Sequence, residues 1–223
     1  MREQADEETE ALRKRSAFEF FLHATSQYPE HALADLVAIR GGGTPSKSNP
    51  SYWQGSVPWI SPKDMKAREL HDAIDHISTR ATEETAARII DPGAVLVVVR
   101  GMILAHTFPS AVLRRPAAIN QDMKALIPGS ELTPEYLCAL LWAFNARFLE
   151  LVEKSTHDTR RLETTKLLAA KIPVPPPDIQ RSIVIAFNRL QSEMDSLRRV
   201  QSESAVELGA LLPSLWRMHS ANY

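Results

Sequence analysis

The chain has 223 residues, a formal net charge of −1 from 26 basic and 27 acidic residues, and one cysteine, a length that fits one domain plus an extension. This charge balance argues against a protein that holds nucleic acid through overall basicity, so any contact with a polyanion must use a local patch or a partner's charges. One cysteine excludes a disulfide framework and a cysteine-rich zinc site, and without an apolar run typical of a signal peptide or membrane span the composition predicts a cytoplasmic protein.

The first predicted elements are a helix and a glycine-rich loop. Apolar residues stand among alternating acidic and basic ones over residues 5–28, which predicts a helix ended by Pro29, and its short hydrophobic face indicates that it docks onto another element. Residues 33–39 predict a short strand or helical turn. Residues 41–53 read GGGTPSKSNPSYW, which predicts a rigid, cationic surface loop whose glycines take backbone conformations closed to other residues. Such a loop suits a polyanion, although the same composition also serves simply to turn the chain.

The middle of the chain alternates short strands and helices. Residues 57–60 predict a strand and residues 82–89 a helix, and a turn at residues 91–93 leads into the β-branched run 94–99, a fully buried strand. Residues 117–127 predict a further strand. We therefore expect an α/β (α+β) domain with a small mixed sheet.

The next segment predicts a helix, a polar loop and a proline joint. Thr133 and Pro134 open the helix with a hydroxyl at the cap and a proline at its first position. A polar loop over residues 155–161 precedes another short helix, and residues 173–177 form a stiff, extended joint. The core residues expected on the first helix, from their helical spacing, are Leu137, Leu140, Leu141, Phe144, Phe148 and Leu151.

A long heptad seam follows the proline joint. Its positions are Ile183, Phe187, Leu190, Met194, Leu197, Gln201, Ser204, Leu208, Leu211 and Leu215. A seam of this length predicts a coiled-coil helix that needs a partner helix, with polar positions that fix register, and with a kink or end near Pro213. The alternative is a helix packed back on its own globular domain, and the proline joint favours projection. The predicted divisions are an N-terminal helical extension (1–30), a globular domain (31–177), the long helix (178–215) and a tail (216–223).

Several segments together resemble a known family. Residues 41–66, 96–101, 118–128 and 171–181 are similar, in family order, to the motifs of specificity (S) subunits of type I restriction–modification systems. The resemblance covers residues 31–212. It does not extend to the N-terminal helix, which could brace the long helix or help to bind a methyltransferase.

The resemblance implies a non-catalytic DNA-recognition protein with one target recognition domain over residues 31–177. Family members hold two such domains apart with an antiparallel helix pair, which acts as a ruler between the halves of a bipartite DNA site. This chain resembles a half-length form, so we expect a homodimer through residues 179–212, or pairing with another half. The implied partners are double-stranded DNA, an adenine-N6 methyltransferase subunit and, through it, a restriction and translocase subunit. The resemblance places S-adenosylmethionine, ATP and Mg²⁺ on those subunits and no cofactor on this chain.

Candidate DNA contacts follow from residue types in polar loops, where binding residues concentrate. Lysine and arginine neutralise phosphates, and arginine and glutamine can read guanine and adenine edges. For Trp59 and Asn120 a packing role is favoured, because apolar strands surround them. Arg68 is a further cation suited to phosphate. The predicted contact residues are Thr44, Ser46, Lys47, Ser48, Lys63, Lys66, Arg100, Gln121, His157 and Arg160.

Catalytic and metal sites are not predicted. Residues 49–52 superficially resemble the Asn-Pro-Pro-Tyr motif of adenine-N6 methyltransferases, but Ser51 replaces the second proline and no suitably placed Gly-x-Gly loop precedes it. His71 and His76 stand near two aspartates, yet their spacing of five misses the i, i+4 alignment of paired ligands on a helix. Two alternatives stay open, namely a solitary DNA enzyme and a protein-interaction subunit that no longer reads DNA.

Overall fold

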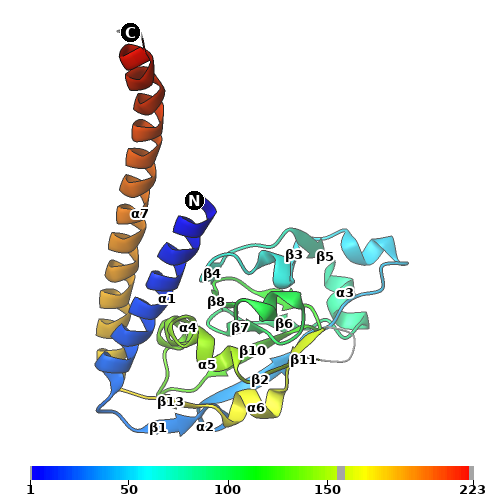
Figure 1. Ribbon diagram of the computed structural model, residues 1–223. Helices are drawn as coiled ribbons and strands as arrows, with labels where there is room; N and C mark the ends of the chain where they lie inside the picture. The colour runs from blue at the N-terminus through cyan, green and yellow to red at the C-terminus, as the bar shows by residue number, and fades with distance from the viewer. Residues whose placement is uncertain (1, 155–158, 221–223) are drawn as a thin grey trace.

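The computed structural model describes residues 2–154 and 159–220, and within them the side chains of residues 9, 11–154, 159–201, 203, 204 and 206. Figure 1 shows a globular part of strands and short helices, with two long helices, α1 (Arg2–Thr25) and α7 (Pro177–Ser220), side by side at its left. The expected architecture, a small mixed α/β domain with an N-terminal and a long C-terminal helix, is confirmed. Within the described ranges no helix has both the length and the hydropathy to span a bilayer.

A five-stranded sheet forms the centre of the globular part. Its order is β2 (Val37–Gly41), β10 (Met123–Pro128), β7 (Val95–Val98), β8 (Ser110–Leu113) and β4 (Glu69–Leu70). Neighbouring strands are antiparallel except β4 with β8. Every residue of β7 is buried, which confirms the buried strand predicted there. Helix α4 (Pro134–Ala143) packs on β7 and β8 and contributes most of its residues to the main core.

A second, four-stranded sheet carries a smaller core. Its order is β5 (Asp75–Ile77), β3 (Val57–Ile60), β9 (Ala117–Ile119) and β6 (Ile89–Ile90), and only β3 and β9 are parallel. The single strand predicted over residues 117–127 is therefore wrong, because β9 and β10 belong to different sheets. The break falls at Asn120, whose side-chain oxygen accepts a hydrogen bond from the backbone N–H of Asp122 at 2.9 Å. Such a local bond competes with strand pairing.

Helix α3 (Thr79–Glu84) packs on the second sheet and begins earlier than the predicted range 82–89. The Ser78 hydroxyl accepts a hydrogen bond from the Ala81 N–H at 3.2 Å and caps the helix. At the other end the Arg88 guanidinium donates to the carbonyl oxygen of Thr82 at 2.9 Å. This bond satisfies one of the carbonyl groups that the end of the helix leaves without a backbone partner.

The remaining elements are short. They are α2 (Leu33–Leu36), α5 (Asn145–Leu149), α6 (Thr164–Ala169), the 3₁₀ helices η1 (Pro50–Trp53), η2 (Pro62–Asp64) and η3 (Met102–Ala105), and the strand pairs β1 (Glu30–Ala32) with β13 (Lys171–Pro173) and β11 (Val152–Lys154) with β12 (Arg160–Leu162). Residues 33–39 thus combine both predicted alternatives, a helical turn followed by a strand. The polar loop predicted at 155–161 is corrected at its end, because residues 160–161 lie in β12.

Gln180 holds the proline joint (residues 173–177) in place through hydrogen bonds. It is fully buried in the first turn of α7. Its side-chain oxygen accepts hydrogen bonds from the N–H and hydroxyl of Thr133 at 2.8 and 3.0 Å. Its amide nitrogen donates to the carbonyl oxygens of Glu131 and Pro175 at 2.7 and 2.8 Å. The Thr133 hydroxyl, predicted to cap α4, makes this contact instead of a cap bond. The joint therefore holds α7 to the domain.

Helices α1, α4 and α7 pack together at the base of α7. The buried rings of Phe21 and Phe187 meet edge to face with centroids 4.9 Å apart, and Phe144 of the α4–α5 junction lies 6.3 Å from Phe21. Further along, the Arg13 guanidinium donates to the Gln191 side-chain oxygen at 3.1 Å. The N-terminal helix therefore docks on another element as predicted, and it braces α7.

The heptad seam divides into a covered and an open part. Ile183 and Phe187 are buried in the chain's own core, Leu190 and Met194 are partly buried, and Leu197 is 64% exposed. Ile183 and Phe187 are thus covered by the chain's own core, so the homodimer expected through residues 179–212 has only the outer part of the seam available. Gln201 and Ser204 are exposed, whereas the side chains of Leu208, Leu211 and Leu215 lie outside the described residues. The helix bounds run past Pro213 to Ser220, so this proline does not end α7.

Candidate nucleic-acid interface

The glycine loop is shaped by close backbone contact. The Gly43 N–H donates to the Ile119 carbonyl oxygen at 2.9 Å. A Cβ atom on Gly42 would lie 2.2 Å from the carbonyl oxygens of both Ile119 and Asn120. Neither Gly42 nor Gly43 has a positive φ, so the predicted reason for these glycines is corrected. Glycine is required because backbone leaves no room for a side chain, that of Ile119 and Asn120 at Gly42 and that of Ala86 at Gly43.

Two tryptophans support the loop from below. Buried Trp59 donates from its indole nitrogen to the Gly43 carbonyl oxygen at 2.9 Å, and Trp53 donates to that of Ser46 at 3.2 Å. The two rings meet edge to face with centroids 5.1 Å apart. The predicted packing role of Trp59 is confirmed. This scaffold leaves the side chains of Thr44, Ser46, Lys47 and Ser48 exposed.

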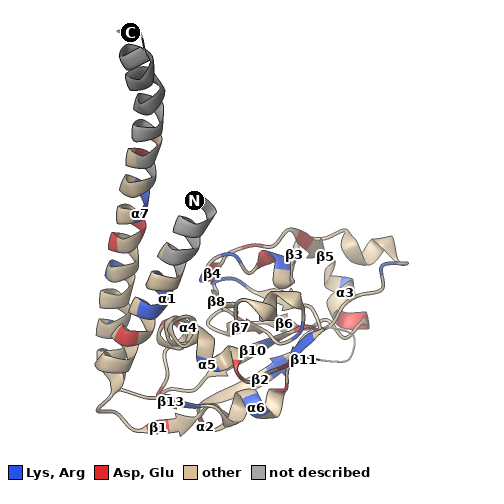
Figure 2. Cartoon of the chain, in the orientation of Figure 1, with Lys and Arg blue, Asp and Glu red and all other residues tan. Residues whose placement is uncertain are grey.

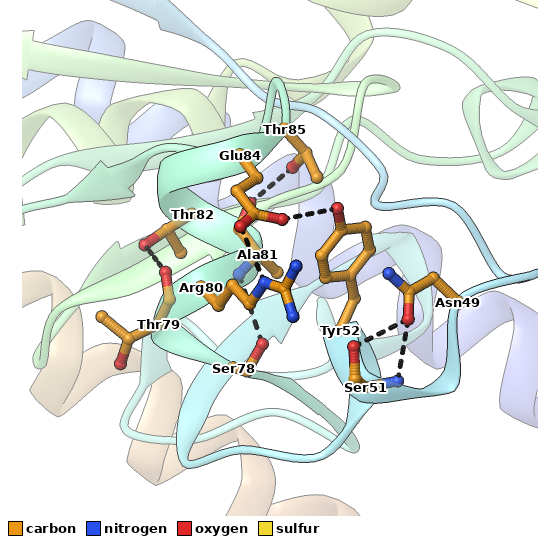
Figure 3. A network of polar contacts seen from close by, with 10 residues as sticks. All are labelled: Asn49, Ser51, Tyr52, Ser78, Thr79, Arg80, Ala81, Thr82, Glu84 and Thr85. Carbon is orange, nitrogen blue, oxygen red and sulfur yellow. Dashed lines mark hydrogen bonds and ion pairs between the residues drawn. The ribbon is translucent and has the colours of Figure 1, made fainter.

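Polar contacts also tie the loop to helix α3 (Figure 3). The Tyr52 hydroxyl donates to Glu84 at 2.9 Å, and the Arg80 guanidinium donates to the other oxygen of the same carboxylate at 2.7 Å. These contacts lower the pKa of the Glu84 carboxyl, chiefly through the bond from Arg80. Since all three groups are exposed or partly exposed, the contacts orient the loop more than they stabilise the fold.

A second group of predicted residues meets where β7 ends and β10 begins. We call Thr44, Arg100, Gln121, Asp122 and Arg160 the edge cluster. The Thr44 hydroxyl donates to the Gln121 side-chain oxygen, and the next residue, Asp122, lies 4.0 Å from the Arg100 guanidinium. The Asp122 carbonyl oxygen accepts hydrogen bonds from the N–H groups of Val99 and Arg100 at 2.8 and 3.2 Å. Residues 77 positions apart in the chain, Thr44 and Gln121, are therefore neighbours on one edge.

Strand β12 joins the edge cluster through its backbone. The Arg160 carbonyl oxygen accepts a hydrogen bond from Gly101 N–H at 3.0 Å, and Arg100 and Arg161 form a β-bridge. The Arg160 Nε is buried and has no hydrogen-bond partner among the described residues. Arg100, by contrast, has half of its side chain exposed. Arg100, Arg160 and the Gln121 amide are thus positioned by backbone hydrogen bonds, and together they could bind a ligand rich in hydrogen-bond acceptors.

Lys47 and Lys63 lie beside a shallow hollow next to the glycine loop. The hollow has a volume of about 460 Å³ and is lined by Lys47, Trp53 and Asp75 among others. The Lys63 ammonium donates to the Asp75 carboxylate at 2.7 Å, and this bond raises the pKa of Lys63. Both groups are partly exposed, so an incoming phosphate can compete for the ammonium at little cost.

The other predicted cations are placed apart from the edge cluster. Lys66 is exposed after η2. Arg68 is directed to the base of α7, where its guanidinium lies 5.2 Å from the centroid of the Phe187 ring; its expected role at phosphate is not supported by this position. His157 lies outside the described residues. Figure 2 shows lysine, arginine and acidic residues interspersed over the globular part, in keeping with the near-zero net charge.

Comparison with known proteins places this geometry in a family. Residues 26–207 match the family model described as the type I restriction modification DNA specificity domain. The chain belongs to this family. It is 34% identical over 166 residues to the EcoR124I/EcoR124II specificity subunit of Escherichia coli, covering 74% of this chain, and 27% identical over 190 residues to the MjaIX specificity subunit of Methanocaldococcus jannaschii, covering 82%.

Two solved structures share the fold of this chain. A chain from a structural study of complex assembly and conformational transition of the type I R-M system aligns with a TM-score of 0.69 and 24% identity over 94% of this chain. The HsdS subunit from Thermoanaerobacter tengcongensis aligns with a TM-score of 0.62 and 22% identity over 90%. At these identities the likeness shows the fold alone.

The specificity-domain chain spans only part of its relatives. It covers 41% and 42% of the lengths of the two curated relatives and 51% and 47% of the two solved chains. The two curated relatives are specificity subunits of type I restriction enzymes. Helix α1 lies outside the matched residues 26–207.

Residues suspected of chemistry have structural partners. The Asn49 side-chain oxygen accepts hydrogen bonds from the N–H and hydroxyl of Ser51 at 3.2 and 2.7 Å, so it caps η1. His76 and Asp72 bond each other at 2.8 Å. In the part of the chain that the structure describes, no group of three or more His, Cys, Asp or Glu side chains is placed to hold a metal ion.

Two members of the interface were missed from sequence. Arg161 is exposed and opposes Arg100 across the β-bridge, and Asp122 supplies the countercharge to Arg100. The signal for Arg161 was its place beside Arg160 in a run of polar residues. Nothing local indicates Asp122, because its role depends on β7 and β10 being neighbours.

Proposed function

We propose that this specificity-domain chain reads one half of a bipartite DNA target and directs a separate adenine-N6 methyltransferase subunit to it. The observation that carries the proposal is the edge cluster, where Arg100, Gln121 and Arg160 converge on one edge of the sheet. Arginine pairs with guanine and glutamine with adenine in the major groove. Gln121 is suited to this role because Thr44 orients its amide while the oxygen keeps a second lone pair and the nitrogen both hydrogens.

Phosphate contacts in this proposal come from the exposed lysines and hydroxyls of the loops, namely Ser46, Lys47, Ser48, Lys63 and Lys66. A chain of net charge −1 cannot hold DNA by overall basicity. The methyltransferase subunit therefore shares the grip on the backbone, and a restriction and translocase subunit joins through it. S-adenosylmethionine, ATP and Mg²⁺ belong to those subunits, and the complex acts in the cytoplasm.

The other half of the target is read by a second copy. Support comes from α7, where the seam positions Leu197, Gln201 and Ser204 are exposed. A partner helix lying on this outer part of α7 buries Leu197 and leaves the base of the helix to α1. Two-fold symmetry then imposes an interrupted palindrome on the target.

Methylation mapping tests the proposal. DNA from cells that express the chain with its cognate methyltransferase should carry N6-methyladenine in two inverted copies of one half-site. An asymmetric bipartite motif would refute the homodimer and retain the recognition role, whereas the absence of any motif would refute recognition. Light scattering on the purified chain is an independent check, since a monomer that persists at high concentration contradicts pairing through α7.

The rival functions have separate tests. Methyl transfer from S-adenosylmethionine, or metal-dependent cleavage of DNA, by the purified chain alone would establish a solitary enzyme. Failure to bind any DNA sequence even with the methyltransferase present would establish a subunit that only binds protein.

A further inference from the structure

A polar crevice separates α7 from the globular domain near the base of the helix. Its inner part, of about 230 Å³, reaches Cys138 of α4, and its outer part, of about 430 Å³, runs along Gln191, Asp195 and Arg199 of α7. Arg68 and Asn188 line both parts. Arg68 comes from the globular domain just before β4, so the crevice has one wall on the domain and one on the helix.

The guanidinium of Arg68 is a cation without a countercharge in contact. It is partly buried, and it lies over the Phe187 ring with 5.2 Å between the guanidinium carbon and the ring centroid. It makes no hydrogen bond or ion pair to any described residue. Burial lowers its pKa and the positive charge of Arg13 acts in the same direction, whereas the more distant carboxylates of Glu69 and Asp195 act against them. A planar fork of five N–H donors in this position is suited to a carboxylate or phosphate.

A second unsatisfied donor lines the same crevice. Gln191 is only 7% exposed, and its side-chain oxygen accepts the hydrogen bond from Arg13 at 3.1 Å. Because a guanidinium can only donate, this contact assigns the oxygen and directs the amide nitrogen elsewhere. That nitrogen is buried and has no acceptor in the described part of the chain. Buried donors are normally paired, so an acceptor is missing from the crevice.

The walls discriminate between possible acceptors. Glu69 and Glu135 line the inner part of the crevice, but both pair with Arg114, at 2.5 and 2.7 Å. Asp195 lines the outer part beside these donors. A DNA backbone offers only acceptors there and would set its phosphates against this carboxylate. A polypeptide offers a carboxylate for the donors and backbone N–H groups for Asp195. The crevice also lies beside α7, whereas Figure 1 places β11, the partner strand of β12 and its arginines, on the far side of the globular part.

We propose that this crevice is a receptor for an aspartate or glutamate side chain of a protein partner, with Arg68 as the residue that binds the carboxylate. The partner is the methyltransferase subunit, so the inference rests on the proposed function. Arg68 then fixes the position of α7 relative to that subunit, while the edge cluster contacts DNA separately. The missing acceptor for Gln191 is supplied by the same docked segment.

Binding of the purified methyltransferase subunit to the full chain, measured by calorimetry without DNA, tests this inference. Arg68→Met keeps the apolar stem over Phe187 and removes the fork. We expect its affinity to fall at least about tenfold, the effect of losing hydrogen bonds to a charged group. Arg68→Lys keeps the charge without the planar fork and should lose less. The control is Arg147→Met, since Arg147 also lies over an aromatic ring, 5.9 Å from the Phe144 centroid, but already pairs with Glu30 at 3.2 Å.

Each outcome decides between the inference and the function on which it rests. Arg68→Met or Arg68→Lys that is folded by circular dichroism and binds within twofold of wild type overturns the inference alone. Weaker self-association, or weaker DNA binding, with unchanged affinity for the methyltransferase subunit also overturns it, because the acceptor then belongs to a second copy or to a phosphate. If the wild-type chain does not bind that subunit at all, both the inference and the proposed partnership fail.

Discussion

Replacing Phe187 by alanine tests whether the base of α7 belongs to the chain's own core. The Phe187 ring is 1% exposed and meets Phe21 of α1 edge to face at 4.9 Å, with Phe20 at 6.0 Å and the Arg68 guanidinium at 5.2 Å. These neighbours belong to two separate parts of the chain, α1 and the segment just before β4. A cavity at this point therefore weakens the attachment of α1 and of the globular domain to α7 together.

The expected loss of stability is large. Truncating a buried phenylalanine to alanine costs about 3–5 kcal/mol, a transfer term plus a cavity term. A domain of this size has a stability of about 5–15 kcal/mol, and each kcal/mol shifts its Tm by about 2–4 °C. We expect Phe187→Ala to lower the Tm by about 6–20 °C in calorimetry, with a matching drop in the urea midpoint.

The matched control is Leu197→Ala on the same helix. Leu197 is 64% exposed, so its truncation should change the stability of a dilute monomer by less than about 0.5 kcal/mol. A destabilisation by Phe187→Ala that disappears at high protein concentration would refute the reasoning, because it would place the ring in a contact between copies. A loss below about 1 kcal/mol at all concentrations would equally contradict the packing described.

Three further predictions concern the loop, the edge cluster and the buried thiol. Gly42→Ala places a Cβ atom 2.2 Å from two backbone carbonyl oxygens and should lower the Tm sharply. In the control Gly41→Ala, the new Cβ atom meets only the flexible end of a lysine side chain at 3.1 Å, so the loss of stability should be no more than about 1 kcal/mol. Equal melting temperatures of the two variants would contradict the close contact at Gly42. In competition titrations, Gln121→Ala should reduce discrimination at one base pair by about 1–3 kcal/mol. Lys47→Ala should weaken binding to all sequences alike and reduce the slope of log K against log salt concentration by about 0.9. A uniform loss of affinity for the Gln121 variant would show that Gln121 does not read a base. Burial raises the pKa of the Cys138 thiol from 9.0 to about 11, so the folded state holds the proton more tightly, and this contribution to stability is complete below pH 9 and is lost as the pH rises through 11. Alkylation at pH 9 should accordingly label unfolded but not native protein, and rapid labelling of the native chain would contradict the burial.

Local sequence patterns correctly predicted strands that are buried on both faces and helices that begin at a typical capping or proline residue. The β-branched run of β7 is buried on both faces, and Pro134 opens α4 as expected. The same reasoning failed at Asn120, where β-propensity continues across residues 117–127 but a side-chain bond to the Asp122 N–H turns the chain into another sheet. A propensity summed over neighbours does not register one competing hydrogen bond.

The candidate interface was predicted as a set of residues and not as a place. Thr44, Arg100 and Gln121 were chosen separately by type, and the structure brings them to one edge because β2, β10 and β7 are adjacent strands. Arg68 was chosen on the same grounds, yet it lies over Phe187 at the base of α7. Residue type indicates what a side chain can bind, whereas its ligand depends on where the chain directs it.

By itself the sequence determined the family motifs and their order, the near-neutral charge that rules out binding by overall basicity, and the seven-residue repeat of α7. Only the tertiary structure decided which part of that repeat is free. Periodicity reports that a helix face is apolar, and it is the same whether the face is covered by another chain or by the chain's own α1. Phe21 and Phe187 stand 166 positions apart and touch, and a contact of that separation is decided by packing of the whole core.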